Sequence, residues 1–316
     1  MSEHHHHDHS HDHDHIFHTH APADKMKTAF FLTFIILIAE GVGGIFSHSL
    51  ALLSDAGHVL TDIAAIGLSW YALNQAQKPA NKKMTFGYSR SGILAAFLNA
   101  MALILISIII LWEAYHRFLH PPEIHSTWMF VSAGVGLVIN LYLGLGMQSI
   151  DDINVKSAVL HMIGDAVASA GVIIGGIVIL FSGWYIVDPI LSVLISLLIA
   201  YGAWKIVKQT IGILMESVPK NIDFHDVVDA IQSIDNVRDV HDLHIWSISD
   251  GKHALSCHVV VNGKMTVEES QHILRELEHR LLHLGIGHTT IQTEDAFHPH
   301  ENTVLCCQDQ VMEHKH

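Results

Sequence analysis

The chain has 316 residues, of which 50% are hydrophobic and only 15% are charged, and its mean hydropathy is +0.34. This composition is too apolar for an ordinary soluble domain and indicates several membrane spans. The formal net charge of −14, without a cluster of basic residues that would suit a phosphate backbone, argues against a nucleic-acid-binding protein.

The N-terminal tail, residues 1–24, is rich in histidine and aspartate. Its first 20 residues hold ten histidines interleaved with three aspartates. Such a segment cannot build a hydrophobic core, so we predict a disordered tail that binds metal ions loosely. It does not have the pattern of a signal peptide. An expression tag is the alternative interpretation of His4 to His7, although the pattern continues well beyond them.

Six apolar segments follow within residues 25–208, which we predict to be the transmembrane domain. Each is near the ~20 residues that an α-helix needs to cross ~30 Å of hydrocarbon. The segments are Met26 to Phe46, Leu50 to Gln75, Ser91 to Phe118, Trp128 to Met147, Lys156 to Phe181 and Ile186 to Val207.

Basic residues lie in alternate connections between these segments. Of the ten Lys and Arg residues that precede Ser217, nine fall on one side and only Arg117 falls on the other. Because basic loops stay in the cytoplasm, we predict a multi-pass protein of the bacterial cytoplasmic membrane with both termini inside the cell.

Two of the segments contain the same intramembrane motif, His-x-x-x-Asp. One copy is His58 and Asp62 in the second segment, and the other is His161 and Asp165 in the fifth. A spacing of four residues places the imidazole and the carboxylate of each copy on one helix face. Two such helices that face each other offer two nitrogens and two carboxylates, which complete a tetrahedral shell for a divalent metal such as Zn²⁺.

The cost of burying these groups favours a metal site. An Asp at mid-bilayer costs on the order of 2.5 to 3.5 kcal/mol, and the two motifs contain two of them. A Zn²⁺ ion with two carboxylates and two neutral imidazoles is formally neutral, so the metal removes the charge that opposes burial. The alternative is a pair of His-Asp hydrogen bonds that only hold helices together, and the repetition of the motif argues against it.

Other polar residues are few within the spans. Asp55 shares the helix face of His58 and Asp62. Four further polar residues occur singly, and for these we predict hydrogen bonds between helices. They are Glu40, Asn99, Asn140 and Ser169.

Residues 209–296 have the pattern of a small soluble domain. The order αββαβ predicts an α+β unit with its helices on one face of the sheet, and a unit of this size would gain stability by dimerising. A capping box and hydrophobic periodicity support the assignments. The elements are a helix from Asp223 to Ile234, strands from Val237 to Ser247 and Ala254 to Val261, a helix from Thr266 to Leu284 and a strand from His288 to Glu294.

This domain also contains candidate ligands for a second metal site. Strand alternation places His241 and His244 on opposite faces, so we do not expect them to serve one site together. The sequence does not show which candidates converge. They are His241, His244, His258, His288 and Glu294.

Residues 297–316 form a predicted flexible tail that contains histidines and cysteines. The three cysteines of the chain are Cys257, Cys306 and Cys307. Two adjacent residues have Cα atoms about 3.8 Å apart, closer than the usual disulfide separation, so the cysteines offer no disulfide framework. We expect reduced thiols, as in the cytosol.

These motifs together resemble the cation diffusion facilitator family, in particular its bacterial cobalt-zinc-cadmium resistance type, over about Met26 to Asp295. The resemblance implies six spans, a cytoplasmic αββαβ domain similar to metallochaperones, a homodimer, and export of metal ions in exchange for protons. It also implies that the two His-x-x-x-Asp motifs form the transport site, and that His58 is associated with a preference for zinc over cadmium. The most specific stretches are Leu53 to Asp62, Asn154 to Asp165, Asp188-Pro189, Glu216 to Pro219 and His241 to Trp246.

The chain departs from this family pattern at two places. Zinc transporters of animals often carry a His-rich segment between spans four and five, whereas here the histidines are at the N-terminus. Some relatives place a His two residues before the acidic ligand of the last strand, where this chain has Gln292. The second departure leaves the composition of the cytoplasmic metal site open.

The expected function is therefore export of Zn²⁺ by a homodimeric proton antiporter embedded in membrane lipid, with Cd²⁺ and Co²⁺ as further candidate substrates. Zn²⁺ bound in the cytoplasmic domain would favour one dimer arrangement and so regulate transport. One alternative is a membrane-embedded zinc metallohydrolase, but a shell of four protein ligands leaves no open position for a water. The other is a metal sensor, which would bind metal without transport.

Overall fold

A computed structural model describes residues 23–147, 153–249, 251–295 and 304–305. Six long helices come first, and each is long and apolar enough to cross a membrane by length and composition. A small domain of two helices and three strands follows. This order confirms the predicted fold class. The six helices are α1 (Ala23–Ser47), α2 (Leu50–Ala76), α3 (Ser91–Leu119), α4 (Ser126–Met147), α5 (Ile153–Ser182) and α6 (Val187–Leu214).

The chain divides into two compact units. The first comprises Met1–Ile63 and Leu105–Ile199, and the second comprises Ala64–Ile104 and Ala200–His316. Helices α2, α3 and α6 therefore contribute to both units. The predicted division at residues 24, 208 and 296 stays a prediction, and both predicted tails lie almost entirely outside the described residues.

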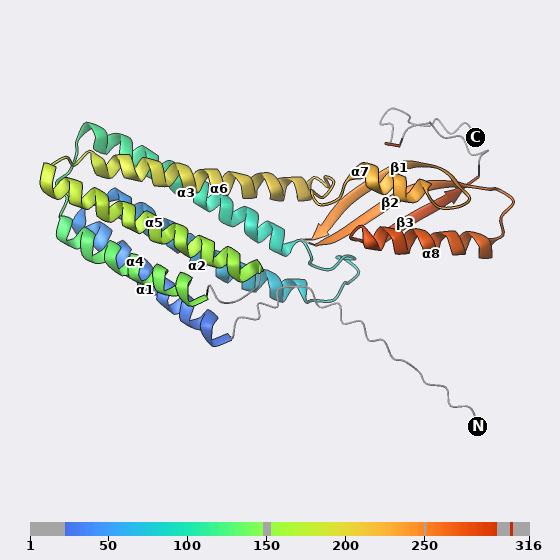
Figure 1. Cartoon of the computed structure of the whole chain (residues 1–316), viewed down its shortest axis with the longest axis horizontal. Helices are drawn as coiled ribbons and strands as arrows, with labels where there is room; N and C mark the ends of the chain where they lie inside the picture. The colour runs from blue at the N-terminus through green and yellow to red at the C-terminus, as the bar shows by residue number, and fades with distance from the viewer. Residues whose placement is uncertain (1–22, 148–152, 250, 296–303, 306–316) are drawn as a thin grey trace, which may run out of the picture. The chain divides into compact units, whose positions relative to one another are not determined.

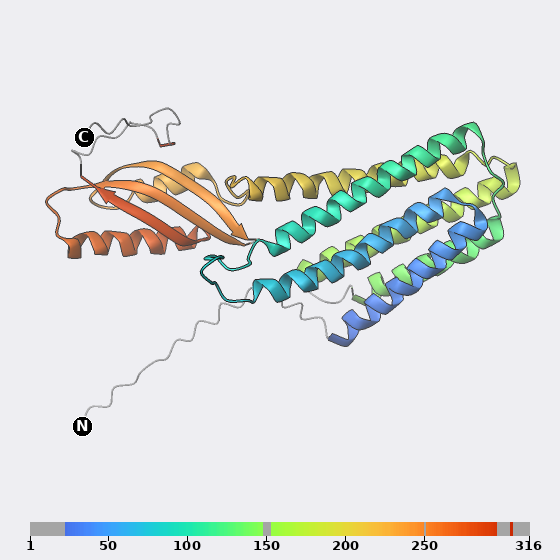
Figure 2. The same ribbon diagram turned by 180° about the vertical axis from the view of Figure 1, so that it is seen from behind.

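In the first unit, α1, α4 and α5 lie side by side (Figures 1 and 2). Their outward surfaces are rich in large hydrophobic side chains; Phe31, Val138 and Phe181 are all exposed. Small residues allow close packing, since a Cβ atom on Gly43 of α1 would overlap the side chain of Ser132 on α4. The helices therefore present to their surroundings the apolar surface that hydrocarbon favours.

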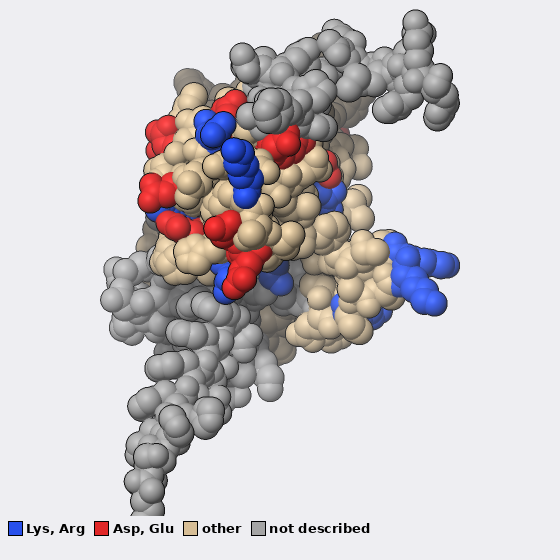
Figure 3. All heavy atoms as spheres, turned by 90° about the vertical axis from the view of Figure 1, so that its right-hand side faces the viewer, with Lys and Arg blue, Asp and Glu red and all other residues tan. Residues whose placement is uncertain are grey.

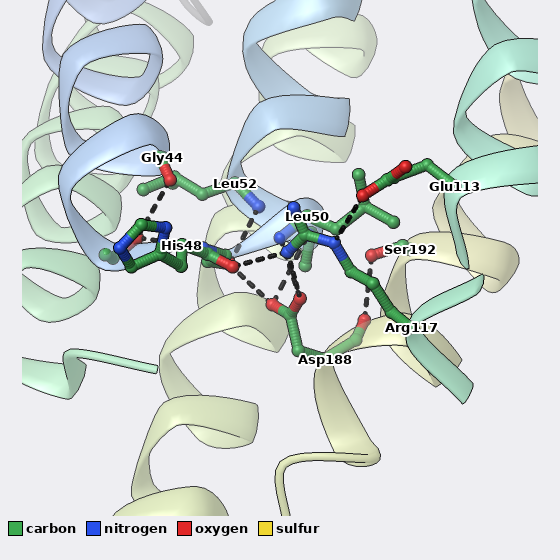
Figure 4. A network of polar contacts seen from close by, with 11 residues as sticks. Gly44, His48, Leu50, Leu52, Glu113, Arg117, Asp188 and Ser192 are labelled. Atoms are coloured by element: carbon green, nitrogen blue, oxygen red, sulfur yellow. Dashed lines mark hydrogen bonds and ion pairs between the residues drawn. The ribbon is translucent and has the colours of Figure 1, made fainter. Parts of the chain in front are cut away.

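The start of α2 is held by a carboxylate from α6 (Figure 4). Asp188 accepts hydrogen bonds from the Leu50 amide at 2.7 Å, the Ala51 amide at 3.3 Å and the Ser49 hydroxyl at 2.5 Å. The first amides of a helix have no partner inside the helix, so a buried anion there satisfies donors that would otherwise be unpaired. Arg117 of α3 lies 4.0 Å from the same carboxylate. Asp188 thus fixes the end of α2 that lies about two turns before His58.

We expect Asp188→Ala to lower the free energy of unfolding by about 2 kcal/mol, because it removes a helix cap and leaves buried donors unpaired. The measurement is thermal unfolding of the purified protein in detergent, followed by circular dichroism. Asp188→Asn keeps one acceptor oxygen and should lose less. An unchanged midpoint for Asp188→Ala would show that the cap adds nothing to stability.

The C-terminal domain is a three-stranded sheet with two helices. The strand order is β1-β2-β3, with β1 antiparallel to β2 and β3 parallel to β2. Helices α7 and α8 contribute to one hydrophobic core together with all three strands, so both cover the same face of the sheet, as predicted (Figure 1). The elements are α7 (Phe224–Gln232), β1 (Val237–Ser249), β2 (Lys252–Val261), α8 (Val267–His283) and β3 (Ile286–Glu294).

The capping box predicted at the start of α8 is present. The Glu269 amide donates to the Thr266 hydroxyl at 3.3 Å, and the Thr266 amide donates to the Glu269 carboxylate at 2.7 Å. Both the amide and the hydroxyl of Thr266 bond to this carboxylate, which lowers the pKa of Glu269.

Acidic and basic side chains are interspersed on the face of the molecule in Figure 3, in contrast to the apolar outer surfaces of α1, α4 and α5.

Candidate metal centres

Helices α2 and α5 bring the two His-x-x-x-Asp motifs together. Across the helices, His161 Nε2 lies 3.2 Å from Asp62 Oδ2, and His58 Nε2 lies 3.7 Å from Asp165 Oδ1. Within the helices, the His58 to Asp62 distance is 3.8 Å and the His161 to Asp165 distance is 3.7 Å. Each imidazole thus approaches both carboxylates, and the four residues form one cluster.

For three of the four residues, the spacing of the ligand atoms suits a tetrahedral metal shell. Ligand atoms about 2.0 Å from a tetrahedral zinc ion stand about 3.3 Å from one another. The four distances above lie within a few tenths of an ångström of that value. His58, Asp62 and His161 form the tightest group, with ligand atoms all within 4.8 Å of one another. Asp165 approaches the two histidines with different oxygens, Oδ1 toward His58 and Oδ2 toward His161, and does not belong to this tightest group.

The cluster is partly accessible. The side chains of His58, Asp62 and Asp165 are largely buried, whereas that of His161 is 49% exposed. His161 is therefore the most accessible of the four side chains.

Further polar residues of the spans are also buried; they include Glu40, Asp55 and Ser169. The Ser169 hydroxyl of α5 donates a hydrogen bond of 3.4 Å to Asp55 on α2, which confirms the interhelical bond predicted for Ser169. The same prediction is wrong for Glu40 of α1. Its carboxylate is fully buried, and neither oxygen has a hydrogen-bond partner among the described residues. In the sequence, Glu40 differs from the other single polar residues of the spans only in being acidic.

A second cluster lies in the C-terminal domain and joins all three strands. His241 Nε2 of β1 lies 3.2 Å from Glu294 Oε2 of β3, and His258 Nδ1 of β2 lies 2.9 Å from Glu294 Oε1. The three ligand atoms fall within 4.8 Å of one another. The strand order explains this convergence, because β2 lies between β1 and β3 and pairs His241 with His258.

The other two candidates do not join this cluster. His244 is exposed and bonds to Asp242 at 3.1 Å, and the exposed His288 contacts the ring of Phe86 edge-on. The alternation argument for separating His241 from His244 is wrong. His241 pairs with His258, and His244 pairs with Ser256. Three residue steps along β1 therefore lie opposite two steps along β2, which marks a β-bulge at Asp242. Because of the bulge, both histidines lie on the same face of the sheet.

Sequence reasoning missed one neighbour of this cluster, Asp242, and left the role of another, Gln292, open. Asp242 Oδ2 lies 3.6 Å from His258 Nε2. The Gln292 amide donates a hydrogen bond of 2.7 Å to Glu294 Oε1, so it orients this carboxylate.

Cys257 faces the hydrophobic core, and burial raises the pKa of its thiol to about 12. A thiol that stays protonated at neutral pH is a poor metal ligand.

Comparison with known proteins gives the family of the chain. Residues 26–215 match the cation efflux transmembrane domain, and residues 219–296 match the cytoplasmic domain of cation efflux proteins. The chain is 42% identical to the cadmium, cobalt and zinc/H(+)-K(+) antiporter of Bacillus subtilis (strain 168), over 92% of this chain and 95% of that protein.

Two further relatives carry similar names. The metal cation efflux system protein CzcD of Cupriavidus metallidurans is 42% identical, over 88% of this chain and 89% of that protein. The zinc transporter ZitB of Yersinia pestis is 37% identical, over 88% of this chain and 90% of that protein. Together with the six apolar helices, these matches show that the chain is a multi-pass membrane protein that belongs to the cation diffusion facilitator family of metal cation efflux proteins.

Proposed function

We propose that this protein is a homodimeric antiporter that exports Zn²⁺ from the cytoplasm in exchange for protons. The observation that carries the proposal is the convergence of two imidazoles and two carboxylates from α2 and α5, whose nitrogen and oxygen atoms approach to between 3.2 and 3.8 Å. The name of the Bacillus subtilis relative includes both zinc and protons. We place the protein in the bacterial cytoplasmic membrane with both termini in the cytoplasm, since the basic connections favour that orientation.

Proton exchange follows from the chemistry of the ligands. His58 and His161 bind a metal only as neutral imidazoles, and Asp62 and Asp165 bind it only as carboxylates. Zn²⁺ from the cytoplasm therefore displaces protons from the shell. When the site opens to the other side, where protons are more abundant, protonation of the same groups releases the metal.

We further propose that the C-terminal cluster of His241, His258 and Glu294 binds a regulatory Zn²⁺. A metal bound by these three side chains would link the end of β3 to β1 and β2. The bound metal would stabilise one arrangement of the dimer. His244 and His288 have no part in this proposal. Cd²⁺ and Co²⁺ occur in the name of the Bacillus subtilis relative, and a shell of two nitrogens and two oxygens does little to exclude them.

Flux in vesicles tests the proposed function. Purified protein is reconstituted into lipid vesicles that contain a fluorescent zinc indicator, and a pH gradient is imposed. We expect zinc uptake that depends on the gradient and stops when an ionophore removes it. Zinc binding without uptake would instead indicate a sensor. Hydrolysis of added esters or peptides without uptake would indicate a metallohydrolase.

Zinc counting tests the regulatory site. Glu294→Gln removes the carboxylate that both histidines contact, so we expect about one fewer tightly bound Zn²⁺ per chain than in the wild type. Equilibrium dialysis with metal analysis gives this number. His244→Ala is the matched control and should bind as many ions as the wild type. Equal zinc content in Glu294→Gln and wild type would place the site elsewhere.

A further inference from the structure

Two histidines of the first unit lie close together outside the metal shell. His48 lies in the connection between α1 and α2, and His125 lies in the connection between α3 and α4. Their ring centroids are 5.9 Å apart. The histidine pairs of the two candidate metal centres have centroid separations of 5.5 and 5.2 Å. His48 and His125 therefore approach each other almost as closely as the histidines of those two centres.

Both histidines line a pocket of about 860 Å³. Three connections of the first unit surround it, because the connection between α5 and α6 contributes Gly183 and Tyr185. Ser126 and Thr127 also belong to the lining. A water molecule takes up about 30 Å³ in the liquid, so the pocket has room for a metal ion with several water ligands beside the two imidazoles.

Contacts with other segments hold the backbone of both histidines. The His125 amide donates a hydrogen bond of 3.0 Å to the Ser47 carbonyl, and Arg117 donates to the His48 carbonyl (Figure 4). His48 has a φ of 58°, in the left-handed region that residues other than glycine seldom adopt. Such a conformation persists only where the surroundings enforce it, and it is frequent at ligand sites. The two imidazoles are thus positioned before any ligand binds.

The two imidazoles are available to a ligand. Both residues are exposed, and among the described residues neither imidazole has a hydrogen bond or an ion pair. The charge of the neighbouring Arg117 is balanced by Glu113 at 3.0 Å and Asp188 at 4.0 Å, so little net positive charge opposes a cation. Imidazole is the commonest metal ligand of proteins and suits Zn²⁺.

We propose that His48 and His125 form a third metal site, which binds a hydrated Zn²⁺ ion on the exit side of the membrane. This inference rests on the proposed orientation and export. Connections that follow the first, third and fifth spans lie on the side opposite to the N-terminus. Among the described residues that line the pocket none is acidic, so the bound ion keeps its charge and binds more weakly than in the four-ligand shell. Weak binding suits an ion that must leave.

Protection of histidines from chemical modification tests this site without any need for transport. The full-length protein in detergent is treated with diethyl pyrocarbonate at rising concentrations of Zn²⁺, and mass spectrometry measures the modification of each histidine. We expect Zn²⁺ to protect His48 and His125 over the same concentration range. His120, exposed beyond the end of α3, should stay reactive. In Asp165→Ala, which lacks a ligand of the transport shell, the protection should persist.

Variants show whether the two histidines share one ion. His48→Asn removes the imidazole and keeps a residue that tolerates the left-handed backbone. In this variant His125 should need at least about tenfold more Zn²⁺ for half protection, because one of two protein ligands is lost. His125→Ala should have the same effect on His48. His120→Asn is the matched control and should leave the protection of both unchanged.

Two results would overturn the third site. One is protection of His48 and His125 over different concentration ranges, or unchanged protection of one after loss of the other. The second is protection of His120 over the same range as the pair, which would mean that Zn²⁺ binds surface histidines without selection. This comparison needs only the wild type, so it decides even if a variant fails to fold.

Thiol labelling tests the exit side. Thr127→Cys places a thiol in the same pocket, and a membrane-impermeant maleimide should label it in intact cells. Labelling only after lysis would place the pocket in the cytoplasm and reject the exit role. The outcomes also separate this proposal from the proposed function. Vesicle flux without protection of the pair would reject the third site alone, whereas protection without flux would reject the antiporter and leave a metal site that receives no exported ion.

Discussion

Asp165→Ala is expected to reduce zinc flux to the background of protein-free vesicles. Asp165 contributes one of two carboxylates, and it contacts both histidines, at 3.7 Å each. Without it a bound Zn²⁺ would keep one net positive charge and one open coordination position inside an apolar bundle. Because removal of partners that only support a ligand costs about 10- to 100-fold in metal affinity, loss of the ligand itself should cost at least as much.

The measurement is initial zinc uptake under a fixed pH gradient, with equal amounts of protein in the vesicles. Size-exclusion chromatography shows whether the variant is assembled as the wild type is. Glu123→Gln serves as the control, since it removes an acidic charge from an exposed loop outside both His-x-x-x-Asp motifs. If Asp165→Ala retains more than half of the wild-type rate, Asp165 does not belong to the transport site.

His58→Asp is expected to slow zinc transport and to raise cadmium flux relative to zinc. The change turns a shell of two nitrogens and two oxygens into one nitrogen and three oxygens, and zinc loses a ligand that suits it. Cd²⁺ is larger and should lose less in a more oxygen-rich shell. The third carboxylate leaves the loaded site with about one negative charge, so a retained proton should shift the pH dependence of flux for both metals.

The decisive quantity is the ratio of cadmium to zinc rates, measured for wild type and variant in the same vesicle preparation. His120→Asp makes the same chemical change at an exposed position beyond the end of α3 and should leave the ratio unchanged. An unchanged ratio in His58→Asp as well would mean that His58 is not the ligand that sets the preference for zinc over cadmium, which would contradict the proposed two-helix shell.

Local sequence pattern determined much of this protein. The second apolar segment, expected from Leu50 to Gln75, is α2 from Leu50 to Ala76, because the length of a hydrophobic run and the period of its polar residues are properties of the segment itself. The same holds for the capping box at Thr266, which depends on residues three apart. The repeated His-x-x-x-Asp spacing placed each pair of candidate ligands on one helix face, and that expectation required no knowledge of the other helix.

Contacts between distant segments decided the rest. Alternation along β1 could not reveal the bulge at Asp242, which changes the face of every residue after it. The members of the C-terminal cluster came only from the registers of β2 with β1 and with β3. The cap that Asp188 provides for α2 joins residues 138 positions apart in the sequence. Glu40 looked like an ordinary interhelical donor or acceptor until packing placed it against Gly136 without a partner. Periodicity reports which side of an element is buried, whereas the partner on that side depends on how whole helices and strands pack.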